Sequence, residues 1–470
     1  MHHSFINGRL STPPLWLRAL LLGSVITAVW WPSLDASFQF DDWNVIVNEP
    51  RVQSLSAWLA AMPGMRPLLK LSYALNHALG HGPRDFRVFN MVVHVLNATL
   101  ITALFTLKGL QQGLTATRAR WTALLTGLLF ALHPAQTEAV TYISGRSSSL
   151  AVLFSLLSLY AWARSETAVD MSARRRYITA CCCTLLLAVA VKETALVMPL
   201  LFWLWSAGTP GSPGFAQRLW IPLAVAIAAL GIAWLLPAYQ QLLSFSLNIR
   251  SVGDNLLTQA HALLYLAGQL LRINHMNADP QLVTVTQPDL LSIMLLAMWL
   301  MLAGWSLRQL RRSSTAAFAI LWFLVCLLPT NTLLPRLDTA NDRQLYLALA
   351  GPSWLVASCS TRFRLQQTFP GKLTIAALLA LLALNTVRRN EVYATEISFW
   401  QTAAAQNPAS ARAANNLGMA YALACQPQEA DSEFERAIAL EPQDFHARIN
   451  RQLLRAGTLP GTDRSNCDAE

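Results

Sequence analysis

The first residues that could carry chemistry are two adjacent aspartates, Asp41 and Asp42, in the stretch FDDWN. They follow an apolar run at 15–34 that is long enough to cross a membrane. Like charges repel and burial raises their cost, so such a pair at a membrane surface needs an explanation. One carboxylate could accept a proton from an attacking hydroxyl, or the two acids could together hold a divalent cation. A solvated acidic loop is the simplest alternative.

Further ionisable residues interrupt apolar runs along the chain. The candidates for binding an anionic substrate are Arg66, His133, Glu138, Arg146, Lys192, Glu193 and Arg343. Ionisable groups at membrane depth are costly, so each is a functional candidate by default. Each also has a structural interpretation. His133 before Pro134 could simply end a helix, Lys192–Glu193 could solvate a tight turn, and an arginine could anchor a helix end at the interface.

Two polar residues, His94 and Asn97, stand inside the second apolar run, in FNMVVHVLNATL. For His94, an interhelical hydrogen bond is a simpler interpretation than a role as a ligand. The seven cysteines make no CxxC pair, so the spacing of metal ligands is absent. The sequence therefore predicts no dedicated metal site.

Composition indicates an integral membrane protein. The 470 residues are 54% hydrophobic and only 13% charged, whereas soluble domains average about 25% charged residues. The net charge of +10 comes largely from short basic clusters between apolar runs, near 108–120, 174–176, 308–312 and 362–372. This pattern orients membrane helices and requires no nucleic-acid partner.

The apolar pattern predicts an all-α polytopic membrane bundle over residues 1–387. Eleven candidate spans lie at 15–34, 88–107, 119–135, 148–163, 177–191, 194–206, 219–237, 289–307, 316–334, 344–359 and 372–387. With a cytoplasmic N-terminus, all four basic clusters fall on the cytoplasmic side. The segment 255–271 would break that agreement if it crossed. We therefore expect it to be an interfacial helix in an outer loop at 238–288, and the first outer loop, 34–87, carries the aspartates.

A change of composition after residue 387 predicts a separate helical domain at 388–470. Its sequence NLGMAYALACQPQEADSEFERAIALEP fits the tetratricopeptide pattern, with Gly418, Phe434 and Pro442 at the expected offsets. One full repeat, half of a preceding one and a capping helix at 443–455 are predicted. So short an array should lean on the membrane domain, because isolated repeats bury little surface.

Together these residue types suit sugar transfer. The outer face has no nucleotide pool, so a sugar there must arrive on a polyprenyl phosphate carrier. Asp41 or Asp42 could accept the hydroxyl proton, and the sequence leaves open which of them does so. Cations would stabilise the departing phosphate, and the available ones are Arg66, Arg146, Lys192 and Arg343.

Six stretches carry a resemblance to a known family. In order they are FDDWNVIVNEPRV, RPLLKLSYALNHALG, FNMVVHVLNATL, LFALHPAQTEAVTYISGR, VKETALVMPLL and NDRQLYLALAG. They resemble the transmembrane and tetratricopeptide-repeat O-mannosyltransferase family over nearly the whole chain. The resemblance implies a type-C glycosyltransferase fold and inverting transfer from a polyprenyl-phosphate-linked sugar to an exported protein. It implies that Asp41–Asp42 is the catalytic motif and that the following residues lie near the donor: His133, Glu138, Arg146, Lys192, Glu193 and Arg343.

The chain is most similar to a short, bacterial-type member of that family. This implies a multi-pass protein of the bacterial inner membrane with a cytoplasmic N-terminus and periplasmic repeats that present or select the acceptor. Two features depart from the family pattern. The repeat array is short, and the triplet usually reading Glu-Arg-Tyr is Asp342–Arg343–Gln344 here.

Two other functions fit the same sequence. An oligosaccharyltransferase or ligase would use a diphosphate-linked glycan at the same membrane face. A transporter or assembly scaffold would use the tail to bind partners, although many transporters have duplicated halves and we find no such duplication.

Overall fold

The computed structural model describes residues 14–80, 82–207, 215–274, 276–277, 279–280, 282–332 and 335–459, and all regular secondary structure within these ranges is helical. This confirms the all-α prediction for the described residues. Residues 1–13, which we predicted to be cytoplasmic, lie outside them.

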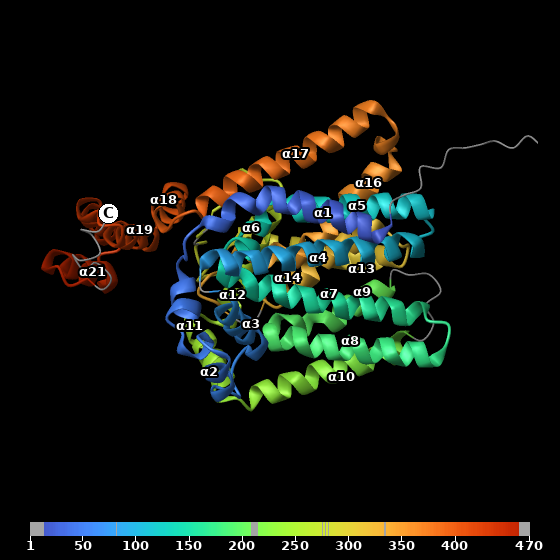
Figure 1. Ribbon diagram of the computed structural model, residues 1–470, viewed down its shortest axis with the longest axis horizontal. Helices are drawn as coiled ribbons and strands as arrows, with labels where there is room; N and C mark the ends of the chain where they lie inside the picture. The colour runs from blue at the N-terminus through green and yellow to red at the C-terminus, as the bar shows by residue number, and fades with distance from the viewer. Residues whose placement is uncertain are drawn as a thin grey trace, which may run out of the picture.

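The body of the protein is a bundle of roughly parallel and antiparallel helices (Figure 1). Its members are α1 (Leu15–Trp30), α4 (Pro83–Gln111), α5 (Ala116–Leu132), α7 (Arg146–Thr167), α8 (Met171–Val191), α9 (Met198–Ala207), α10 (Phe215–Trp234), α13 (Leu290–Leu310), α14 (Thr315–Leu327), α16 (Ala350–Arg362) and α17 (Phe369–Val392). Each apolar run that we predicted overlaps one of these helices. The run at 316–334 is helical only as far as Leu327, because Pro329 disfavours continuation.

Among the described residues, four helices are long and apolar enough to cross a membrane. They are α1 with the short helix that follows it (Leu15–Asp35), α4, α13 and α17. Two bent pairs would raise the number to six: Pro134–Val140 with Ile143–Thr167, bent by 93°, and Arg218–Trp234 with Pro237–Ile249, bent by 88°. These helices fit a membrane protein, and the count of eleven spans stays a prediction.

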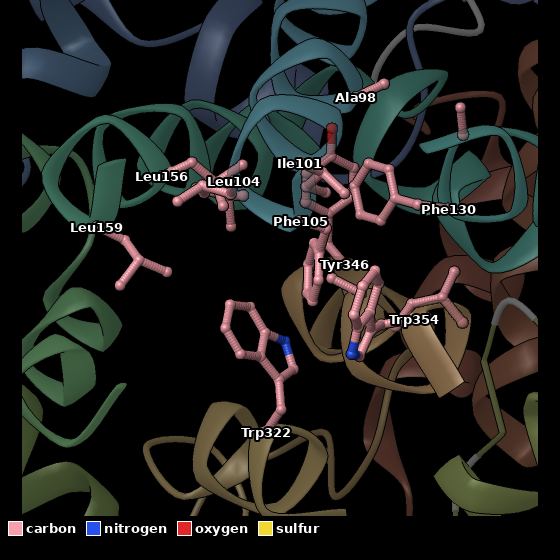
Figure 2. Packing of buried hydrophobic residues seen from close by; sticks show 14 of the residues in the cluster. Ala98, Ile101, Leu104, Phe105, Phe130, Leu156, Leu159, Trp322, Tyr346 and Trp354 are labelled. Atoms are coloured by element: carbon pink, nitrogen blue, oxygen red, sulfur yellow. The ribbon is translucent and has the colours of Figure 1, made fainter. Parts of the chain in front are cut away.

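Aromatic rings from α4, α14 and α16 fill the centre of the bundle (Figure 2). The ring of Phe105 lies 5.0 Å from that of Trp354 and 5.7 Å from that of Trp322, centroid to centroid. All three side chains are fully buried. Trp322 also donates its indole N–H to the carbonyl of Leu347, 2.9 Å away. The core therefore fixes the short helix α15 (Leu345–Ala348) against the bundle.

His94 makes the interhelical hydrogen bonds that we predicted. Its Nδ1 lies 2.7 Å from the Tyr346 hydroxyl, and its Nε2 lies 3.1 Å from the carbonyl of Ala131. Asn97 donates to the same hydroxyl over 3.1 Å. These contacts join α4, α5 and α15 below the loop that follows α14.

Short helices and loops cover one end of the bundle, which we call the loop end. They include α2 (Leu55–Ala60), α3 (Pro67–Leu79), α6 (Thr137–Val140), α11 (Pro237–Ile249) and α12 (Val252–Gln269). The turns between α7 and α8 and between α16 and α17 lie at the opposite end, with two of the basic clusters (Figure 1). A helix does form where we predicted one at 255–271. Its interfacial position stays a prediction.

The C-terminal helices project from the loop end (Figure 1). They are α18 (Glu396–Gln406), α19 (Ala411–Leu423), α20 (Pro427–Leu440) and α21 (Phe445–Ala456). Helices α19 and α20 approach closely at Gly418, where an added Cβ would lie 2.8 Å from the Phe434 ring. Helix α21 lies where we predicted a capping helix, and the assignment of these helices as tetratricopeptide repeats stays a prediction.

Candidate active site at the loop end

The Asp42 side chain faces the protein interior. It is completely buried, and its Oδ1 accepts hydrogen bonds from the backbone N–H of Ser144, at 2.8 Å, and from the Ser144 hydroxyl. Its Oδ2 accepts from the backbone N–H of Gln39 over 3.2 Å. Ser144 belongs to the short turn Ile143–Gly145 that precedes α7. Asp42 therefore ties residues 37–43, which we call the acidic loop, to the bundle, and it lines neither of the two cavities described below.

Burial raises the pKa of Asp42 to about 6, although hydrogen bonds from Ser144 and the charge of Arg87 act in the opposite direction. The folded protein thus holds this proton more tightly than an unfolded chain, in which the pKa is near 3.8. Its contribution to stability is present at low pH and is lost as the pH rises through about 6.

This shift predicts a pH dependence that Asp42→Asn should remove. Between about pH 4 and pH 6, the melting temperature of the wild type in detergent should fall relative to that of the variant, because only the wild type must ionise this buried group. Thermal unfolding of both proteins across that window measures the difference. A difference that does not change with pH would contradict the assignment.

Asp41 instead lines a cavity, whose empty space, including the part open to solvent, is about 420 Å³. We call this cavity the acidic chamber. It is lined by four acids and five aromatic residues, together with Arg343, Arg412 and neighbouring residues: Asp41, Glu138, Asp279, Asp338, Phe40, Tyr142, Tyr393, Phe399 and Trp400. The residue before the aspartate, Phe40, has a φ of 43°, in the left-handed region that is uncommon for such a residue.

Arginines neutralise three of the four acids in the acidic chamber. Glu138 accepts a hydrogen bond from the Arg343 backbone N–H at 3.0 Å, and its carboxylate lies 3.4 Å from the Arg343 guanidinium. Asp279 accepts from Arg412 Nε over 3.1 Å. Asp338 lies 3.1 Å from Arg412 and 3.8 Å from Arg343.

The carboxylate of Asp41 differs from these three. Within the described part of the chain, no hydrogen bond or ion pair reaches its oxygens, and its backbone N–H donates to the Tyr142 hydroxyl at 3.1 Å. It is therefore the chamber acid without a partner among the described residues. Burial acts to lower the pKa of Arg343, but the charges of Glu138, Asp338 and, to a smaller extent, Asp41 help to raise it above its ordinary value.

A second cavity adjoins the first and shares Asn341 and Arg343 with it; its empty space, including the part open to solvent, is about 610 Å³. We call it the cationic chamber. Lys192, Arg336 and Arg343 line it, and no described acid does. Its other lining residues include the hydroxyls of Ser148, Ser155, Thr194 and Thr330 and apolar side chains such as Val152, Val197, Met198 and Leu347.

The environment of Lys192 indicates that the cationic chamber favours an anion. The residue follows α8, and its amine donates to the Ser148 hydroxyl over 2.8 Å. Burial lowers the pKa of Lys192 well below its ordinary value, and the charges of Arg343, Arg66 and Arg336 lower it further. A phosphate among these cations would offset that repulsion and favour the charged amine.

Arg66 and Glu193 form an ion pair with each other outside both chambers. Arg66 Nε donates to Glu193 Oε2 over 3.0 Å, and a second hydrogen bond joins the same two side chains. Burial acts to raise the pKa of Glu193, but Arg66 brings it down to about 2, so the pair stays ionised. Arg66 has a φ of 50° and precedes α3, so the pair anchors that helix to the end of α8.

Arg146 is fully buried and its donors are used within the protein. Its Nε donates to Asn90 Oδ1 at 2.7 Å, and its terminal nitrogens donate to the carbonyls of Ser72 and Phe86. Aromatic rings surround the guanidinium, the nearest being Phe89 at 4.3 Å. In this arrangement Arg146 joins α7 to α3 and α4 and lines neither chamber.

His133 ends α5, as the structural interpretation predicted. It is extended, with φ −75° and ψ 131°, immediately before Pro134. Its Nδ1 accepts from the backbone N–H of Ala135 at 3.2 Å, and its Nε2 lies 3.3 Å from the carbonyl of Leu270. His133 lines neither chamber.

The two aspartates do not converge on a common point. Asp41 lines the acidic chamber, whereas the Asp42 oxygens accept hydrogen bonds from N–H and O–H groups of Gln39 and Ser144. Donors so placed do not fit a cation shared by both carboxylates. The described residues contain no group of three or more His, Cys, Asp or Glu side chains that could hold a metal ion.

Sequence reasoning found some of the other site residues and missed the rest. Arg336 and Asp338 stand in the same polar stretch as Arg343, and the charge pattern indicates them as ionisable candidates beside an apolar run. Asp279 and Arg412 are isolated charges in a loop and in the tail, where charged residues are ordinary. No local pattern indicates that they meet.

Comparisons with known proteins identify homologues, although no family model matches the chain. The chain is 32% identical to human protein O-mannosyl-transferase TMTC4 over 175 residues, covering 33% of this chain and 24% of the relative. Human TMTC1 is 34% identical over 164 residues, covering 31% and 18%. Mouse TMTC3 is 23% identical along an alignment of 489 positions, covering 92% of this chain and 52% of the relative. The chain thus spans about half or less of the length of these relatives.

Proposed function

We propose that this chain, which is homologous to the TMTC protein O-mannosyl-transferases, is an inverting membrane glycosyltransferase acting on a protein hydroxyl. The observation that carries the proposal is the pair of chambers. One holds the free carboxylate of Asp41, the other holds cations without an acid, and Arg343 borders both. A base on one side of a reacting centre and anion-binding groups on the other are what glycosyl transfer from a phosphate requires.

The reaction would proceed by one displacement. The acceptor hydroxyl, lying in the acidic chamber, gives its proton to the Asp41 carboxylate as its oxygen attacks the anomeric carbon of the sugar. The bond from that carbon to the carrier phosphate breaks, and the phosphate oxygen keeps the electron pair. Lys192, Arg336 and Arg343 would stabilise this oxygen. Attack from the side opposite the leaving group inverts the anomeric centre.

The other candidate residues, most of which lie outside the chambers, would have supporting roles. Glu138 holds Arg343 by an ion pair, and Asp42 holds the acidic loop. Arg66, Glu193, His133 and Arg146 would support the chamber walls from positions outside them. The apolar side of the cationic chamber suits a lipid-borne donor, which we take to be a polyprenyl phosphate carrying a sugar.

We place the site on the outer face of a bacterial inner membrane, with an exported protein as acceptor. The support is indirect: two basic clusters lie at the end of the bundle away from the site, and basic residues are retained on the cytoplasmic side. The C-terminal helices would then be periplasmic.

Intact-mass analysis of exported proteins tests the proposal. A strain that contains this protein should carry acceptors heavier by one sugar than those of a strain without it. An added mass equal to a whole glycan would instead indicate an oligosaccharyltransferase or ligase. Identical masses in the two strains would contradict both assignments.

A further inference from the structure

The C-terminal helices form one wall of the acidic chamber. Phe399 and Trp400 come from α18 and Arg412 comes from α19, and all three line the cavity together with Glu138 and Tyr142. The same helices share a hydrophobic cluster with the bundle, in which Tyr142 packs with Tyr393 and Trp400. The tail and the chamber are therefore one packed structure.

One side chain of the tail, Glu396, holds the acidic loop on both sides of the aspartates. Its Oε1 accepts a hydrogen bond from the backbone N–H of Phe40 at 2.8 Å. The same oxygen accepts from the indole N–H of Trp43 at 3.1 Å. Asp41 and Asp42 lie between these two anchored residues, so the position of Asp41 depends on a residue of α18.

The backbone conformation of Phe40 explains why the hydrogen bond from Phe40 to Glu396 matters. Its φ of 43° is costly for a residue with a side chain, so surrounding contacts must maintain it. The Glu396 hydrogen bond acts on that residue directly, and the Phe40 ring meets the Trp400 ring edge-on, with centroids 5.1 Å apart. Both contacts come from α18.

A second attachment joins the tail to the bundle through the chamber acids. Arg412 lies 3.1 Å from Asp338 and is bonded to Asp279, and these acids belong to two different loops. The tail is thus held at the acidic loop by Glu396 and at these two loops by Arg412. Arg412, Asp279 and Asp338 line the same cavity as Asp41.

We propose that α18 and α19 are the acceptor-side wall of the site and that Glu396 is a positioning residue that sets the orientation of Asp41. The catalytic consequence of this proposal rests on the proposed function. The positioning of the acidic loop by Glu396 does not depend on it. The tail then takes part in the chemistry through the loop that carries the base.

Two substitutions of Glu396 in the full-length protein separate hydrogen bonding from charge. The amide oxygen of Glu396→Gln can accept both hydrogen bonds, whereas Glu396→Ala can accept neither. Glu391→Ala is the matched control, because Glu391 is an exposed acid near the end of α17 whose side chain makes no hydrogen bond within the described ranges. All three proteins should be compared with the wild type in nanodiscs.

Hydrogen exchange of residues 37–43 gives a readout that does not need activity. Glu396→Ala should speed exchange there by about tenfold or more, because local opening follows the loss of the anchoring hydrogen bonds. Glu396→Gln and Glu391→Ala should exchange like the wild type. Unchanged exchange in Glu396→Ala, or equally fast exchange in the Gln and Ala variants, would overturn the positioning role.

Transfer assays complete the test. Glu396→Ala should lower kcat by about tenfold or more, since small misplacements of a reacting group cost this much, and the KM for the donor should stay within about twofold of the wild-type value because the cationic chamber is intact. Glu396→Gln should retain near-wild-type kcat. Fast exchange with unchanged kcat in Glu396→Ala would overturn the link to Asp41. If the wild-type protein transfers no sugar, the proposed function is wrong, but the exchange result still holds.

Discussion

Replacing Asp41 with Asn should lower sugar transfer by about 10²–10⁴-fold, the range expected for loss of a general base. The substitution keeps the size of the side chain and removes its ability to take up the hydroxyl proton. The protein should still fold and insert, because the Asp41 carboxylate has no partner among the described residues that its loss could leave unsatisfied. Transfer to a peptide acceptor in nanodiscs, followed by mass spectrometry, measures the effect.

Two further aspartate variants make this prediction specific. Asp35→Asn is the surface control, because Asp35 is exposed and pairs only with the exposed Arg84, and it should transfer normally. Asp42→Asn should also lose transfer, but through disorder of the acidic loop, since the amide cannot accept from both Ser144 and Gln39 as the carboxylate does. Wild-type transfer by Asp41→Asn would end the assignment of this base.

Replacing Arg343 with Gln should have a double effect. Transfer should fall by about 10²–10³-fold, because a donor to the departing phosphate is removed. The free energy of unfolding should also fall, by about 3–5 kcal/mol, which is the cost of leaving a buried charge without its partner. Glu138 is only 6% exposed and is paired with the Arg343 guanidinium, so its carboxylate would be left unpaired.

A second substitution separates the two effects. In the double variant Arg343→Gln/Glu138→Gln the uncompensated carboxylate is gone, so the melting temperature should return most of the way to the wild-type value. Transfer should stay low, because the leaving phosphate still lacks its arginine. Arg84→Gln, at an exposed ion pair, is the matched control. Recovery of transfer in the double variant would show that Arg343 serves only the fold.

The fold was predictable where hydropathy alone determines structure. The runs at 88–107 and 372–387 lie within α4 and α17, because long apolar segments without helix breakers form helices whatever packs around them. Ends of helices were less predictable. The helix predicted at 316–334 ends at Leu327, because Pro329 disfavours its continuation even within an apolar run.

The site was predictable in residue type and only partly in geometry. Asp41, Lys192 and Arg343 reach the chambers. Arg146 is fully buried, and its donors bind Asn90 and backbone carbonyls instead. A sequence shows that a charge is present but does not show which partner neutralises it. For the same reason the difference between Asp41 and Asp42 could not be read from adjacent letters.

The bond between Phe40 and Glu396 spans 356 positions of the chain, and this distance has a consequence for biosynthesis. Ribosomes deliver the N-terminal part first, so the acidic loop reaches the membrane long before α18 exists. A nascent chain that has inserted its early helices therefore still lacks the contact that orients its carboxylate. Such a protein would stay inactive until translation has passed α18 and that helix has packed against the acidic loop.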